Sequence, residues 1–148
     1  MPHAAPMSQT IEQCLRDLGW AIVPIEGTSM EPLLQAGRCQ AQVAASDGTP
    51  FQKGDVVLYR RASGALVLHR IMGVETDGTY LLCGDHQWKP LERVRQEQIL
   101  AAAQGFFRKG RYIDDNTAWY RVYKRIWNGN LMIRRCCLAI LRGFEKKL

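Results

Sequence analysis

Two residues of this sequence carry side chains that can act together as a nucleophile and a base. Ser29 lies in the stretch Gly27-Thr28-Ser29-Met30-Glu31-Pro32, and His69 follows forty residues later, at the end of the apolar run Leu66-Val67-Leu68. A serine hydroxyl is a weak nucleophile until a nearby base takes its proton, and histidine titrates close to neutral pH. The pair therefore indicates serine hydrolase chemistry.

Both residues also have a purely structural interpretation. Ser29 can be an ordinary turn or helix N-cap residue, because serine is common at both kinds of position. His69 can be a strand histidine whose ring nitrogen makes a hydrogen bond within the core. The other two histidines are less well placed for catalysis, since His3 lies near the N-terminus and His86 follows the turn residues Gly84-Asp85.

The elements around these residues are mostly short strands separated by turns that contain Gly and Asp. Strands are expected at Trp20–Ile25, Cys39–Ala45, Val56–Arg60, Ala65–Val74, Tyr80–Cys83 and Ile99–Gln104. A short amphipathic helix is expected at residues 9–19, and another short helix at Met30–Gln35 would place Ser29 at its start. This pattern predicts a mainly β, antiparallel fold. It lacks the strand–helix alternation and glycine loop of a nucleotide-binding sheet.

Length and composition narrow the class of protein further. A chain of 148 residues corresponds to about one domain, and no run of apolar residues is long enough to predict a membrane-spanning helix. The start of the chain has no basic segment followed by an apolar one, so we expect no secretory signal and a cytoplasmic location. Five cysteines without a CxxC spacing predict neither a disulfide framework nor a metal site, and no cofactor is expected.

The net charge of +6 is concentrated in the last part of the chain. Residues 1–107 hold nine Lys/Arg and eleven Asp/Glu, a net charge of −2, whereas residues 108–148 hold eleven and three, a net charge of +8. We therefore divide the chain into an N-terminal helical segment (1–19), a catalytic domain (20–107) and a basic amphipathic tail (108–148). The tail opens with Arg108-Lys109-Gly110-Arg111, which we interpret as a flexible link, and is otherwise expected to be helical.

Three interpretations of the tail remain open. It can pack on the domain, lie on an anionic membrane surface, which would make the protein peripheral there, or bind an acidic partner. Nucleic acid is the less favoured ligand for it.

The order of four motifs resembles the type I signal peptidase superfamily, which includes the LexA-type self-cleaving repressors. The motifs are Gly27 to Pro32, Lys53-Gly54-Asp55-Val56-Val57, Leu68-His69-Arg70-Ile71-Met72-Gly73-Val74 and Gly84-Asp85, and the resemblance covers roughly residues 20–104. It implies a β-rich peptidase fold with Ser29 as the nucleophile. His69 stands where many members have a lysine base, as in the subgroup that uses Ser-His chemistry.

The chain also departs from that family's pattern at several positions. Gly27 stands where many signal peptidases have a serine that binds the oxyanion, which leaves the Ser29 backbone N–H as the expected donor. Gly37-Arg38 replaces a frequent Gly-Asp, and the aspartate that the histidine subgroup carries beyond Gly84-Asp85 is missing. Asp85 is the preferred group to orient His69, and Glu92 is the alternative.

The resemblance leads to one principal hypothesis and one alternative. The first is a serine endopeptidase that cleaves a peptide or protein precursor, such as a leader peptide, bound as an extended strand. The alternative is a non-catalytic module of the same fold that binds a peptide or another partner.

Overall fold

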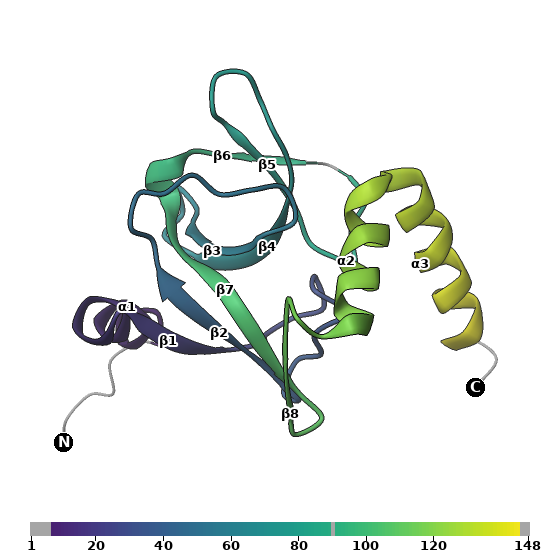
Figure 1. The fold of residues 1–148 in the computed structure, drawn as a ribbon, viewed down its shortest axis with the longest axis horizontal. Helices are drawn as coiled ribbons and strands as arrows, with labels where there is room; N and C mark the ends of the chain where they lie inside the picture. Colours follow the sequence, from purple (N-terminus) through teal and green to yellow (C-terminus); the bar gives the residue numbers. More distant parts are fainter. Residues whose placement is uncertain (1–6, 90, 146–148) are drawn as a thin grey trace.

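The computed structural model describes residues 7–89 and 91–145, and over these residues the fold is mainly β (Figure 1). Eight strands form one antiparallel sheet with the order β1-β2-β7-β3-β4-β5-β6, and β8 pairs with β7. The expected mainly β, antiparallel fold class is confirmed. The strands are β1 (Trp20–Pro24), β2 (Cys39–Ala45), β3 (Val56–Arg60), β4 (Leu66–Val74), β5 (Tyr80–Cys83), β6 (Glu92–Val94), β7 (Ile99–Arg108) and β8 (Arg111–Asp114).

Three α-helices accompany this sheet in the described part of the chain: α1 (Met7–Leu18), α2 (Ala118–Gly129) and α3 (Leu131–Glu145). A short 3-10 helix, η1 (Gln96–Gln98), precedes β7. α1 lies near β1 and β2 at one end of the molecule, and the α2–α3 hairpin lies at the other end (Figure 1). The short N-terminal helix and the helical character of the C-terminal region are therefore as expected. None of the helices within the described ranges is long and apolar enough to cross a membrane.

Two consecutive hairpins place His69 in the middle of the sheet. β3 and β4 pair with Val57 opposite His69 and Tyr59 opposite Val67, around a turn that contains Gly64. β4 then pairs with β5, with Arg70 opposite Cys83. Since apolar runs and glycine turns predict both hairpins, the strands that carry His69 follow directly from the sequence.

Three local predictions are wrong. Residues 30–35 form turns instead of a helix, because Pro32 has no N–H to donate and only Leu34 makes a helical bond, to the Met30 carbonyl. The strand β6 was not predicted. Residues 108–111 are not a flexible link but the turn of the β7–β8 hairpin, in which Lys109 and Gly110 both have positive φ (50° and 73°). A pair of left-handed residues is what a tight two-residue hairpin turn requires.

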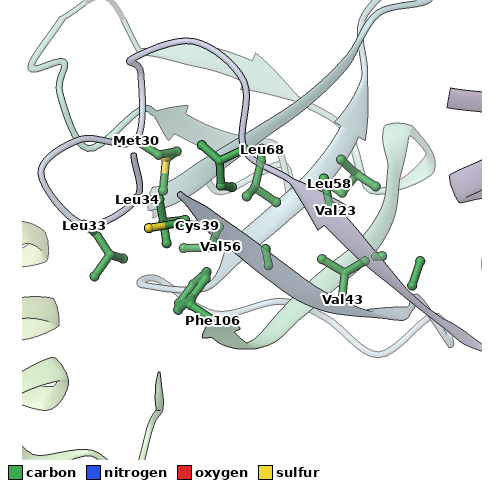
Figure 2. Packing of buried hydrophobic residues seen from close by; sticks show 14 of the residues in the cluster. Val23, Met30, Leu33, Leu34, Cys39, Val43, Val56, Leu58, Leu68 and Phe106 are labelled. Carbon is green, nitrogen blue, oxygen red and sulfur yellow. The ribbon is translucent and has the colours of Figure 1, made fainter. Parts of the chain in front are cut away.

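The main core lies between the sheet and the loop that joins β1 to β2 (Figure 2). Met30, Leu33 and Leu34 of this loop are almost fully buried and pack among strand residues that include Val23, Leu68 and Phe106. The loop therefore contributes to the core although it contains no helix or strand. Each fully buried aliphatic side chain stabilises the fold by about 2 kcal/mol, so these three side chains hold the loop firmly.

Residues 108–145, the described part of the segment that the sequence analysis set apart as a tail, contribute to the same body as the strands. β8 extends β7, and Tyr120 and Trp127 of α2 are buried. On α3, the Arg134 side chain is completely buried. The helical hairpin therefore packs on the β-strands through large aromatic and charged side chains.

Candidate active site

Ser29 lies one residue before the buried part of the β1–β2 loop. Its neighbour Met30 is 2% exposed, whereas Ser29 itself is half-buried. Gly27 has a φ of 70°, a left-handed conformation that favours glycine, and the Glu31–Pro32 peptide bond is cis. The loop thus turns at Gly27, two residues before Ser29, while Met30 anchors it in the core.

A second turn, formed by residues 84–87, packs against the backbone of Ser29. The His86 N–H donates to the Ser29 carbonyl oxygen at 2.9 Å. Gly84 lies so close that a Cβ in its place would overlap the Ser29 carbonyl oxygen and lie 3.0 Å from the Ser29 Cβ. Glycine is therefore required at this position for the turn to reach Ser29.

His69 is buried on β4 and is linked to a carboxylate through a tyrosine. Its Nδ1 lies 3.2 Å from the Tyr59 hydroxyl, which donates to Glu92 Oε2 at 2.5 Å. Arg61 holds the same carboxylate with two hydrogen bonds, of 3.0 Å from Nε and 2.9 Å from Nη2. The chain of contacts Arg61–Glu92–Tyr59–His69 is called the relay below.

The relay determines which ring nitrogen of His69 carries the proton. An ionised carboxylate only accepts hydrogen bonds, so the single hydroxyl proton of Tyr59 points to Glu92. The Tyr59 oxygen is then an acceptor for Nδ1–H of His69, and Nε2 keeps its lone pair. This is the tautomer that can take a proton from a nucleophile.

The charges of the site agree with this assignment. Burial, and to a lesser extent the positive charge of Arg61, lowers the pKa of His69 to about 4, so the imidazole is neutral at pH 7. Burial acts to raise the pKa of Glu92, but the hydrogen bonds from Arg61 and Tyr59 outweigh it, and the net shift of the Glu92 pKa is downward. Burial and the contact with Glu92 raise the pKa of Tyr59, which stays protonated.

Ser29 and His69 line the same cavity, which has a volume of about 590 Å³. Gln87 and Arg61 contribute polar groups to its wall. Much of the remaining wall is apolar, with Val23 of β1, Ile25 of the β1–β2 loop, Leu68 of β4 and Ile11 of α1 among the residues. The structure therefore brings the two main candidates of the sequence analysis to one concave surface.

Asp85, by contrast, does not contact His69 among the described residues. It accepts two hydrogen bonds from Arg70, of 2.8 Å and 2.9 Å, and a third from the Tyr123 hydroxyl at 2.7 Å. Both Asp85 and Arg70 are fully buried. The expectation that Asp85 orients His69 is therefore corrected: its carboxylate is occupied by an ion pair, and Glu92, the alternative, is the acid linked to His69.

Tyr59, Arg61 and Arg134 are site residues that the sequence analysis missed. Tyr59 lies diagonally across from His69 in the β3–β4 hairpin, two residues beyond its direct partner Val57, within reach of a long side chain. The register of the predicted hairpin was thus a usable signal. No local signal marks Arg134, which reaches the Gly84 and Gln87 carbonyl oxygens from α3 at 3.1 Å and 3.0 Å.

Comparison with protein-family models and with curated proteins finds no match to this chain. Over residues 7–89 and 91–145, no three His, Cys, Asp or Glu side chains gather in the way that a metal ion requires.

Proposed function

We propose that this protein is a serine endopeptidase in which Ser29 is the nucleophile and His69 is the general base. The observation that carries the proposal is the relay, which orients a buried, neutral imidazole that lines the same cavity as Ser29. The motif resemblance to type I signal peptidases points to the same two residues.

The proposed reaction starts with the attack of Ser29 Oγ on a peptide carbonyl carbon. As the C–O bond forms, His69 Nε2 takes the hydroxyl proton, and the resulting imidazolium is stabilised by Tyr59 and, through it, by the negative charge of Glu92. The imidazolium then gives this proton to the leaving amine as the C–N bond breaks. Water, activated by the same nitrogen, hydrolyses the acyl-enzyme and restores Ser29.

The negative charge on the carbonyl oxygen requires hydrogen-bond donors. The backbone N–H groups of Ser29 and Met30 make no hydrogen bond to any residue that the structure describes. They lie at the sharp turn after Gly27, where successive N–H groups can converge on an oxyanion. We propose these two N–H groups as the donors. They would take the place of the serine that many signal peptidases have at the position of Gly27.

The substrate proposed is an extended segment of a peptide or protein precursor, such as a leader peptide. β1 is the last strand on its side of the sheet, and Val23, Pro24 and Ile25 at its end line the cavity. A free strand edge can pair with an extended peptide and deliver its carbonyl groups in register. Pro24 offers no N–H, so the pairing would use the remaining backbone groups of the strand.

The first experiment measures covalent labelling of the protein by a fluorophosphonate, followed by mass spectrometry of the labelled peptide. We expect one adduct, on Ser29, and cuts in a diverse peptide mixture that Ser29→Ala and His69→Ala both abolish. Ser63→Ala is the matched control, since Ser63 is exposed in the β3–β4 turn. If folded wild-type protein is neither labelled nor active on peptides, the peptidase proposal is wrong.

The second candidate is a non-catalytic peptide-binding module with the same cavity. It is favoured by one observation: Asp85, the acid expected beside His69, is committed to Arg70. In that case Ser29→Ala would leave peptide binding intact and the wild-type protein would resist the fluorophosphonate.

A further inference from the structure

α3 turns its most apolar side away from the protein. It contacts the body through the buried side chains of Arg134 and Leu138, which are 0% and 3% exposed. Ile133, Ile140 and Phe144, spaced by seven and four residues, form a stripe on another side of the helix and are 50%, 60% and 66% exposed. Burying this stripe is the ordinary solution for a helix in a globular protein, so its exposure calls for a covering surface.

The exposed face is wider than this stripe and is bordered by arginines. Met132 and Cys136 are also exposed and lie beside it. On a helical projection, Arg135 and Arg142 fall between this apolar face and the side that packs on the protein, and both are exposed. The nearby helix α2 adds exposed Arg121 and Arg125.

The positive charge of the C-terminal region favours an anionic surface over a second copy of the chain as the cover of this face. Residues 108–148 carry a net charge of +8, so a second copy of this chain docked through α3 would bring two strongly basic segments together. An anionic surface, by contrast, attracts them. In Figure 1, α3 is also the outermost element on its side of the molecule, and α2 lies between it and the strands.

We infer that α3 binds the surface of an anionic lipid bilayer, with Ile133, Ile140 and Phe144 inserted at the level of the acyl chains. Arginines at the border of an apolar helix face extend their long side chains to lipid phosphates, while the apolar residues enter the interface. Each basic group near an anionic membrane contributes about 1 kcal/mol, and the contribution weakens as salt increases. This inference does not depend on the proposed peptidase activity.

The test is co-sedimentation of the full chain with phosphatidylcholine vesicles, with and without phosphatidylglycerol. We expect binding to the anionic vesicles, weakening as salt is raised, and little binding to the neutral ones. The double substitution Ile140→Glu/Phe144→Glu should reduce binding at least about tenfold, since it removes apolar contacts and adds repulsive charge. Leu18→Glu is the matched control, because Leu18 is 61% exposed on α1.

Three results would overturn the inference. One is the absence of binding to anionic vesicles by a folded protein. Another is equal loss of binding in Leu18→Glu and in the double variant, which would mean that general charge and not α3 is responsible. The third is a concentration-dependent dimer that the double variant dissociates while vesicle binding stays unchanged, which would assign the apolar face to self-association.

Discussion

Tyr59 is the residue on which the proposed chemistry of His69 most depends. Its hydroxyl is the only group that joins the imidazole to Glu92 among the described residues, and the whole side chain is buried. A phenylalanine keeps the ring and its packing but removes this bridge. Nδ1 then loses its acceptor, and the tautomer with a free Nε2 lone pair is no longer favoured.

We therefore predict that Tyr59→Phe lowers the rate of Ser29 labelling by about 100-fold, a typical size for general-base effects. The measurement is the second-order rate constant for the fluorophosphonate. Tyr80→Phe is the control, since Tyr80 is also buried and its hydroxyl also makes two hydrogen bonds, to Gln96 at 2.7 Å and from the Phe51 N–H at 3.1 Å. Equal losses in both variants would mean that the effect is one of packing and not of the relay.

The lowered pKa of His69 predicts an unusual acid range for the reaction. The neutral imidazole is the active form, and with a pKa of about 4 it stays neutral at pH 5, where an ordinary histidine with a pKa of 6.5 is mostly protonated. The labelling rate of Ser29 should therefore be nearly constant from pH 7 to about 5 and fall only near pH 4. A midpoint close to 6.5 would contradict the buried environment of His69.

The same shift makes His69 a source of pH-dependent stability. Between about pH 6.5 and 4 the unfolded chain takes up a proton at His69 that the folded protein does not, so the free energy of unfolding decreases as the pH falls through this range. The loss by pH 4 is about 3 kcal/mol from this residue. Urea unfolding should show a smaller decrease between pH 6.5 and 4 in His69→Gln than in the wild type, because the variant lacks the contribution of His69 while those of carboxylates such as Glu92 remain.

Among the elements of the fold, the turn of residues 84–87 matters most for the position of Ser29. It contacts the β1–β2 loop through the His86 N–H, and its Gly84 and Gln87 carbonyl oxygens accept hydrogen bonds from Arg134 of α3. The helical hairpin thus supports the candidate site without lining the cavity. A larger side chain at this contact should displace Ser29 while leaving the sheet intact.

Gly84→Ala tests this role of the turn. The added methyl group would overlap the Ser29 carbonyl oxygen, so the two loops must separate, at a cost of about 1–3 kcal/mol in stability. We expect the labelling rate of Ser29 to fall in protein that is still folded. In the control Gly73→Ala the methyl group meets only Leu81 Cδ1, at 3.8 Å, and the rate should not change. Similar behaviour of the two variants would show that the turn does not position Ser29.

The strands around His69 were predicted well, whereas the loop at residues 30–35, the turn at residues 108–111 and the strand β6 were not. The hairpins around His69 follow from runs of apolar residues and turn glycines. β6 has only three residues and exists through its pairing with β5, which no local pattern announces. Glu92 lies on this strand, and for that reason its approach to Tyr59 was not foreseen.

For the molecule as a whole, the buried charges around Asp85 join the strands to the C-terminal helices. Asp85 accepts hydrogen bonds from Arg70 of β4 and Tyr123 of α2, and its own carbonyl oxygen accepts one from Trp127 Nε1 at 2.8 Å. Burial opposes the charge on Arg70, but the ion pair with Asp85 outweighs it and raises the pKa of Arg70, which keeps its charge. In the sequence these residues belong to separate motifs, and no local pattern indicates that Arg70, Asp85 and Tyr123 meet in the folded protein.

Asp85→Asn should therefore act on stability and not directly on the base. The substitution leaves the buried Arg70 without its counter-charge, and breaking a buried pair in this way costs about 3–5 kcal/mol. We expect a lower free energy of unfolding and faster proteolysis of residues 118–145, because Tyr123 also loses a charged partner. Measured under conditions where the variant is folded, the midpoint of the pH–rate profile should move only slightly downward, because the charge of Asp85 makes the smallest of the contributions to the pKa of His69. A large shift of the midpoint with unchanged stability would restore Asp85 to the role first expected for it, as the acid that acts on His69.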